Sequence, residues 1–116
     1  MSFRRGDVVV VSLRTAEGSE QRGTRPCVIV QNDVANRSGA TTMVVPITKR
    51  ANVPADLLPV HVLIKREEGG LQFESVADCG QVVTVSFRSL QSTQGSLSHR
   101  TMADIDQKLK VALALR

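Results

Sequence analysis

Short runs of β-branched residues recur along this chain, and they constrain its fold more than any other feature. The segment from Val8 to Leu13 opens with four consecutive valines, and similar runs occupy residues 26–31, 41–46, 61–64, 75–79 and 82–85. β-branched side chains pack well on a pleated surface, and runs of this length are typical of strands. The pattern therefore predicts a sheet built from short sequential strands.

Polar turn residues separate these predicted strands. Asn32-Asp33 and residues 36–39 predict a turn connection after the second strand, and Glu68-Gly69-Gly70 predicts another after the fourth. Residues 49–59 contain two prolines and show no periodicity, so they are expected to form a loop.

The periodicity changes to helical spacing from Ser98 onward, where Ser98 or Thr101 can serve as the N-cap. The apolar positions of this predicted helix are Met102, Ile105, Leu109, Ala112 and Leu113. One amphipathic helix is thus expected to pack on the sheet. Sequential strands that end in a helix predict an α+β, mainly β fold, either a small antiparallel barrel or a strongly bent sheet.

The size and composition of the chain predict one globular domain over residues 1–116. A chain of 116 residues with 41% hydrophobic and 22% charged residues can build one hydrophobic core and is not typical of a disordered protein. No apolar run approaches the roughly 20 residues that span a bilayer. Gly6-Asp7 stands where a signal peptide would need an apolar stretch, so we expect a cytoplasmic protein without membrane association.

The two cysteines, Cys27 and Cys79, lack the spacing of metal ligands. We expect both thiols to be reduced and buried, and we expect neither a metal nor another cofactor.

The positive charge is concentrated in the N-terminal half of the chain. The net charge is +4, and most of the arginines precede residue 51 while few carboxylates do. This balance favours a polyanionic partner or an acidic protein. A soluble domain that is merely basic is the alternative interpretation.

Residues 18–26 combine glycines, arginines and a carboxylate between two valine-rich runs, which predicts a polar loop held by a rigid scaffold. Arg25 precedes Pro26, and proline restricts the residue before it to extended conformations. A guanidinium can donate two parallel hydrogen bonds to phosphate, so Arg25 suits the developing charge when a 2′-hydroxyl attacks the adjacent phosphate of RNA. A solvated loop arginine is the alternative.

Other candidate residues carry weaker signals. Thr48 follows the third predicted strand, where its hydroxyl can donate to a phosphate or satisfy local backbone. Glu20 can accept a proton, orient Arg25 or simply lie at a loop tip, whereas Ser19 and Gln21 can contact substrate or fill the turn. His61 and His99 are candidates for acid–base chemistry by residue type, but neither neighbours the arginine loop in sequence.

Several fragments together resemble the MazF/PemK/Kid toxins of type II toxin–antitoxin systems. They are Arg5-Gly6-Asp7-Val8, Gly18-Ser19-Glu20-Gln21, Arg25-Pro26, Val30-Gln31-Asn32-Asp33, Pro46-Ile47-Thr48, Pro59-Val60-His61-Val62 and Asp78-Cys79-Gly80-Gln81. The resemblance implies an SH3-like barrel with a C-terminal helix, a homodimer, and a sequence-specific, metal-independent endoribonuclease that acts on single-stranded RNA and arrests growth. It also implies an acidic, partly disordered antitoxin that covers the substrate groove, with operator DNA bound only through the antitoxin complex.

The resemblance also implies roles for individual residues. Arg25 and Thr48 match the catalytic pair, and Glu20 matches the glutamate of the loop. Residues expected to contact RNA are Ser19, Gln21, Arg22 and Gln81. The chain departs from the family pattern at Gly80 and Val83, where many members have an acidic residue and an arginine.

Two other classes of function compete with a ribonuclease. CcdB-type toxins share a similar barrel and poison DNA gyrase by binding, but a pure binder has no need of Arg25 and Thr48 together. A plain nucleic-acid-binding regulator would need only the basic charge, and its binding would survive replacement of Arg25.

Overall fold

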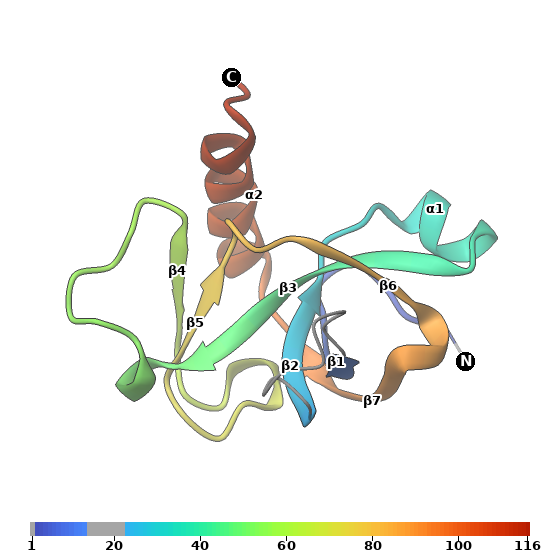
Figure 1. Cartoon of the computed structure of the whole chain (residues 1–116), viewed down its shortest axis with the longest axis horizontal. Helices are drawn as coiled ribbons and strands as arrows, with labels where there is room; N and C mark the ends of the chain where they lie inside the picture. Colours follow the sequence, from blue (N-terminus) through green and yellow to red (C-terminus); the bar gives the residue numbers. More distant parts are fainter. Residues whose placement is uncertain (1, 14–22) are drawn as a thin grey trace.

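The computed structural model describes residues 2–13 and 23–116, which form a sheet of antiparallel strands with a C-terminal helix (Figure 1). The strands are β1 (Asp7–Leu13), β2 (Gly23–Ile29), β3 (Thr41–Lys49), β4 (His61–Ile64), β5 (Ser75–Asp78), β6 (Val83–Ser86) and β7 (Leu90–Ser96). The α-helices are α1 (Asp33–Ser38) and α2 (His99–Leu113), and three short 3-10 helices are η1 (Arg50–Asn52), η2 (Glu68–Gly70) and η3 (Phe87–Ser89). The predicted mainly β class with a C-terminal helix is confirmed.

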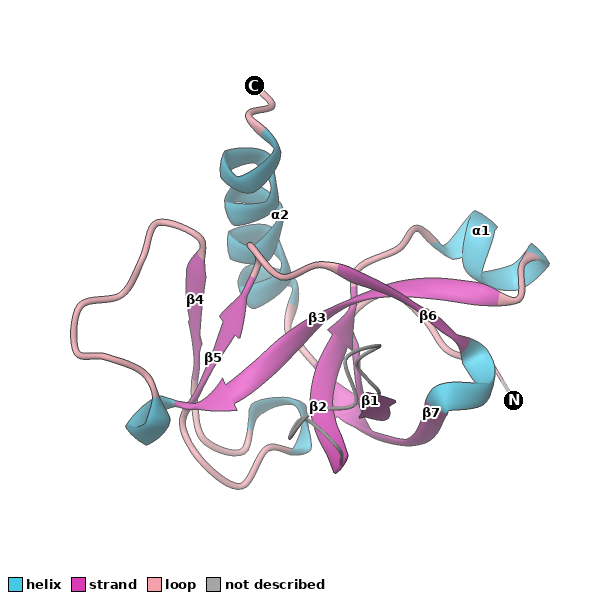
Figure 2. Ribbon diagram, in the orientation of Figure 1, coloured by secondary structure: helices cyan, strands magenta, loops and turns pink. Residues whose placement is uncertain are grey.

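The long strand β3 organises the sheet, whose order is β4-β5-β3-β2-β1-β7. Residues 41–44 of β3 pair with β6, and residues 47–49 pair with β5, so one strand serves two parts of a bent sheet. Figure 2 shows β3 as the long diagonal strand with α1 at its beginning and η1 at its end. Among residues 2–13 and 23–116 no pairing joins β4 to β7, so closure of the predicted barrel stays a prediction.

The central strands are apolar on both faces because each face is covered by a core cluster. One cluster lies against α2 and includes Val8, Val28, Val45 and Ile105, whereas the other takes the alternate residues of the same strands. That second cluster consists of Val9, Val11, Cys27, Ile29, Val44 and Leu90, with Phe3, Val85 and Phe87 packed against it. Strands buried on both faces read as continuous apolar runs, which explains the consecutive valines of β1.

The first turns of α2 follow the sequence prediction, but its end does not. The Ser98 side chain accepts a 3.1 Å hydrogen bond from the Thr101 amide, and Met102 and Ile105 are buried. The prediction that Ala112 and Leu113 lie on the packed face is wrong, because both residues are exposed. The last turn of α2 projects beyond the sheet, as Figure 1 shows.

Two elements differ from the sequence predictions. The expected turn after β2 is the helix α1, whose N-cap Asn32 accepts a hydrogen bond from the Ala35 amide. Strand β7 was not predicted, because its residues are mostly polar and exposed, and it pairs with β1 through an irregular register. Polar residues can form a strand when one partner strand supplies the backbone hydrogen bonds.

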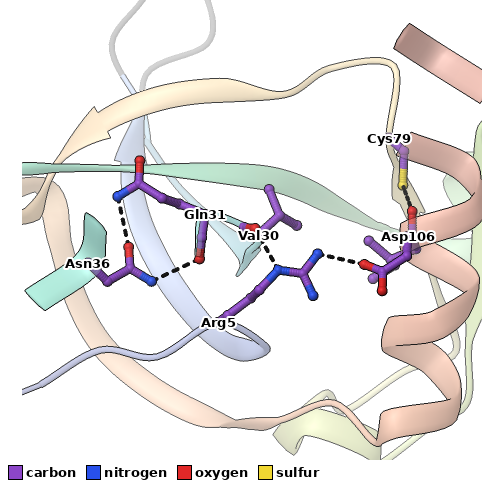
Figure 3. Close-up of polar contacts among 7 residues, drawn as sticks. Arg5, Val30, Gln31, Asn36, Cys79 and Asp106 are labelled. Carbon is purple, nitrogen blue, oxygen red and sulfur yellow. Dashed lines mark hydrogen bonds and ion pairs between the residues drawn. The ribbon is translucent and has the colours of Figure 1, made fainter. Parts of the chain in front are cut away.

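A polar network ties the N-terminal segment to the rest of the fold (Figure 3). The Arg5 Nε–H donates to the Val30 carbonyl at 2.7 Å, and an Arg5 terminal nitrogen donates to the Asp106 carboxylate at 2.6 Å. Next to Val30, the Gln31 side-chain amide donates to the Asn36 side-chain oxygen at 2.9 Å, and the Asn36 side-chain amide donates to the Gln31 carbonyl at 2.9 Å.

In the part of the chain that the structure describes, no helix has the length and apolar character to cross a membrane.

Candidate active site

The first residues of β2 separate from the end of β3 next to two proline residues. Cys27 pairs with Pro46, and continuing the same antiparallel register would place Arg25 opposite Thr48. The β2–β3 pairing stops at Cys27–Pro46, and neither Pro26 nor Pro46 has an amide hydrogen to donate. Beyond this point β3 pairs with β5, whereas Arg25 keeps its partner Val11 in β1. The fold thus brings Arg25 and Thr48 to a point where the sheet opens.

A pocket of about 420 Å³ occupies this opening. Its described lining contains two cations, Arg25 and Lys49, and no carboxylate. The hydroxyl and amide side chains at its surface belong to Thr24, Thr48, Asn52, Gln72, Ser75 and Gln94, and the apolar ones include Val10, Pro26, Ile47, Leu71 and Phe73. Cations with several neutral donors and acceptors suit an anionic ligand that also carries polar edges, such as a nucleotide.

The positive charge of Arg25 affects the pKa of the buried Cys27 thiol. Burial raises the pKa of Cys27 to about 12, and the nearby Arg25 charge lowers it only in part. Both cysteines are free and buried, as expected. Cys27 belongs to the second core cluster, and because a protonated, buried thiol is a poor nucleophile, it is not a reactive group.

The sequence predicts that Thr48 follows the third strand, but in the structure Thr48 lies inside β3. It is half-buried and pairs with Val76 of β5, which fixes its backbone. The strand extends to Lys49 because β5 continues the pairing that β2 gives up. A hydroxyl on a paired strand is held more firmly than one on a loop, which suits a group that must meet one phosphate oxygen.

Comparison with known proteins identifies the family. Residues 4–113 match the model of the PemK-like, MazF-like toxins of type II toxin–antitoxin systems. This chain belongs to that family. The resemblance seen in the sequence fragments is therefore confirmed, and it extends over nearly the whole length of this MazF-family toxin.

Solved structures share the fold of this MazF-family toxin at low sequence identity. It is similar to an endoribonuclease solved with its cognate antitoxin from a mycobacterial species, with a TM-score of 0.80 and 22% identity over 99% of this chain and 98% of that one. It is also similar to MazF from Deinococcus radiodurans, with a TM-score of 0.79 and 20% identity over 99% of both chains. A third similar structure is the Mycobacterium tuberculosis toxin MazF-mt6, with a TM-score of 0.77 and 21% identity over 95% of this chain and 98% of that one.

The structure places only some of the predicted site residues of this MazF-family toxin in the pocket. Arg25 and Thr48 both border it. Four predicted residues, Ser19, Glu20, Gln21 and Arg22, lie outside the described part of the chain. Leu13 and Gly23, which flank residues 14–22, pair with each other next to the pocket residue Thr24.

Gln81 is not among the described residues that line the pocket. It is exposed in the turn between β5 and β6, where its amide donates to the Asp78 carbonyl at 3.1 Å. At the neighbouring departure from the family pattern, a Cβ on Gly80 would lie 3.2 Å from an Asp78 carboxylate oxygen and 3.3 Å from Val60. An acidic side chain at residue 80 would therefore meet both crowding and a like charge.

The two histidines lie outside the pocket. The His61 Nδ1 atom accepts a 3.0 Å hydrogen bond from the Leu58 amide, and its Nε2 atom lies 3.7 Å from the Asp78 carboxylate. The His61 side chain is only 9% exposed, so it serves the structure of the β4–β5 edge. His99 is exposed at the first turn of α2.

Several pocket residues were missed by sequence reasoning. Lys49 and Asn52 were assigned to a loop without function, and Gln94 lies on the unpredicted strand β7. Phe73 was not singled out at all. The pairing of Lys49 with Ser75 brings the segment before β5 to the pocket, and no local sequence signal reveals such a pairing.

Proposed function

We propose that this MazF-family toxin is an endoribonuclease that cleaves single-stranded RNA at specific sequences and needs no metal. In this reaction the 2′-oxygen of the RNA forms a bond to the adjacent phosphorus, and the bond from phosphorus to the 5′-oxygen breaks. The 2′-hydroxyl loses its proton and the departing 5′-oxygen gains one. The products carry a 2′,3′-cyclic phosphate and a 5′-hydroxyl.

The observation that carries this proposal is the shared pocket of Arg25 and Thr48. The two residues come from different strands and border one hollow whose described lining has cations but no carboxylate. Family membership and the endoribonucleases among the solved relatives give further support.

The proposed roles follow from the chemistry of each side chain. The Arg25 guanidinium stabilises the negative charge that builds on the phosphate oxygens, and it keeps its own charge because a guanidinium stays protonated in proteins. The Thr48 hydroxyl donates a hydrogen bond to one of these oxygens. Glu20 accepts the 2′-hydroxyl proton or orients Arg25. We propose Ser19, Gln21, Arg22 and Gln81 as RNA contacts.

The test is incubation of the purified protein with a long single-stranded RNA in the presence of EDTA. We expect discrete cuts with cyclic-phosphate ends. Removal of one stabilising donor typically costs about 100-fold or more in rate, so Arg25→Ala and Thr48→Val should both be strongly impaired. Arg37→Ala is the matched control, because Arg37 is an exposed arginine of α1 at the other end of β3.

Two outcomes would count against the proposal. Intact RNA after incubation with folded, antitoxin-free protein would favour a CcdB-like binding toxin that acts on gyrase. RNA that is bound but not cut, with binding that survives Arg25→Ala, would favour a nucleic-acid-binding regulator.

We also propose that residues 1–116 act as one cytoplasmic toxin domain that forms a homodimer and binds an acidic antitoxin. The mycobacterial relative was solved with its cognate antitoxin, and a chain of net charge +4 suits an acidic partner. Size-exclusion chromatography with light scattering measures the dimer. Titration calorimetry should show that antitoxin and RNA compete, whereas independent binding would argue against a shared groove.

A further inference from the structure

Phe73 is the one phenylalanine of this chain that is largely open to solvent. The chain has three phenylalanines and neither tryptophan nor tyrosine. Phe3 and Phe87 stack on each other with ring centroids 6.0 Å apart and pack against the core. The Phe73 side chain is 52% exposed in the segment between η2 and β5. Single exposed apolar residues are common, so its surroundings decide whether it has a function.

The backbone around Phe73 is held in place although the ring is exposed. The Ser75 hydroxyl donates to the Phe73 carbonyl at 2.8 Å. The Arg50 amide donates to the Glu74 carbonyl at 2.8 Å, and the Glu67 amide donates to the carbonyl of the buried Leu71 at the same distance. A ligand that binds the ring therefore has little backbone to order, which reduces the entropic cost of binding.

A cation accompanies the ring at the edge of the pocket. The Lys49 Nζ atom lies 4.0 Å from the centroid of the Phe73 ring, and both residues line the pocket that contains Arg25 and Thr48. Phe73 also borders a neighbouring hollow of about 480 Å³, whose lining includes Arg66 and Gln72 but not Lys49. The ring thus stands at the boundary between the two hollows.

The geometry points to a base-binding subsite on Phe73, which rests on the proposed ribonuclease activity. The ring stacks an unpaired base of the RNA next to the scissile phosphate, and Lys49 neutralises an adjoining phosphate. Single-stranded RNA presents unstacked bases that aromatic side chains can bind, and every base offers a π-face. Gln72, next to the ring, offers an amide to the edge of the base.

Binding should be measured with an RNA that carries a 2′-deoxy nucleotide at the mapped cleavage site, since this RNA cannot be cut. Loss of a stacking platform weakens binding roughly 10- to 100-fold, and we expect this from Phe73→Ala and Phe73→Leu. Phe73→Trp should retain affinity. Val34→Ala is the matched control, because Val34 is 69% exposed on α1 at the far end of β3.

Fluorescence gives an independent readout of stacking. Because the chain has no tryptophan, Phe73→Trp introduces a single indole, and stacking on a base should quench its emission when the RNA is added. The indole of Val34→Trp should show no such quenching. Lys49→Gln should reduce the slope of log affinity against log salt concentration by about one unit, which corresponds to the loss of one phosphate contact.

The subsite and the ribonuclease can fail separately. If the wild type cuts RNA but folded Phe73→Ala binds the deoxy-substituted RNA as tightly as the wild type, the subsite is wrong and the ribonuclease stands. Equal quenching at residues 73 and 34 would overturn the subsite in the same way. If the wild type does not cut RNA, the ribonuclease itself is wrong and the subsite falls with it.

Discussion

The Arg5 guanidinium and the Asp106 carboxylate form an ion pair of 2.6 Å that joins the N-terminal segment to α2. The same guanidinium donates to the Val30 carbonyl at 2.7 Å, so one side chain connects the start of the chain, the end of β2 and the C-terminal helix. The two side chains are 30% and 45% exposed, which places the pair at the protein surface.

Removal of this ion pair should lower stability by a modest amount. Partly exposed ion pairs contribute about 0.5–1 kcal/mol, so Asp106→Ala should lower the free energy of unfolding by about that much. Arg5→Met should cost about 1–2 kcal/mol, because the bond to Val30 is lost as well. Urea unfolding of both variants and of the double variant gives the coupling energy, and a coupling near zero would show that the pair contributes nothing.

Asp33 should make stability depend on pH. The Arg5 amide donates to its carboxylate at 2.8 Å and the Asn36 amide at 3.1 Å, and these bonds lower the pKa of Asp33 below its ordinary value. A lowered folded-state pKa contributes stability above the unfolded-state pKa of about 3.9, and this contribution is lost as the pH falls through the folded-state value.

Asp33→Asn should therefore unfold more easily than the wild type at neutral pH, and the difference should shrink below about pH 4. Urea unfolding over a range of pH measures this difference. Asp104→Asn removes an exposed carboxylate of α2 and controls for the change in net charge. A difference for Asp33→Asn that stays constant with pH would contradict the assigned pKa shift.

Both thiols should resist alkylation in the folded protein. Burial raises the pKa of Cys27 to about 12, and burial with the nearby Asp78 charge raises that of Cys79 to about 11. Because the thiolate is the reactive form, iodoacetamide at mildly alkaline pH should modify neither residue until the protein is unfolded. Mass spectrometry measures the modification, and rapid native labelling of Cys27 would mean that β2 opens easily.

Gly70 should tolerate no side chain. Its φ is +78°, and an added Cβ would collide with the Gln94 carbonyl oxygen of β7. We expect Gly70→Ala to lower the free energy of unfolding by about 2–4 kcal/mol, from left-handed strain together with overpacking. Gly23→Ala is the control, because Gly23 has a φ of +139° but no residue of the described part of the chain lies within 4 Å of its Cβ position. Equal thermal destabilisation of the two variants would show that the contact with β7 adds nothing.

Local patterns predicted the elements whose signals are local. The valines of β1 were read correctly, and Ser98 was one of the two N-caps proposed for α2, because apolar runs and capping residues act within a few positions. The helix α1 was missed because Asn32, Asp33 and Asn36 also suit a turn, and only the structure shows the buried Asn36 bonded to Gln31 and Thr42.

The residues of the candidate site also fall into those that local sequence signals could reveal and those that they could not. Arg25 could be singled out because Pro26 follows it, and Thr48 because it ends an apolar run. Lys49, Phe73 and Gln94 could not, because the register of β3 with β5 and the polar strand β7 bring them to the pocket. Register depends on contacts between distant segments, which a single sequence does not display.

The close packing of η2 on β7 has a consequence for how relatives of this protein can diverge. Gly69 leaves no room for a Cβ beside the side chains of Val8 and Leu97, and Gly95 leaves none beside the backbone of Gly69, so close packing fixes the start of the segment that forms one pocket wall. The exposed positions 72 and 73 that follow also line the pocket and are free of this constraint. Inherited changes at these two positions can alter what the wall recognises while the path of the chain stays the same, so new substrate preferences can arise without a new fold.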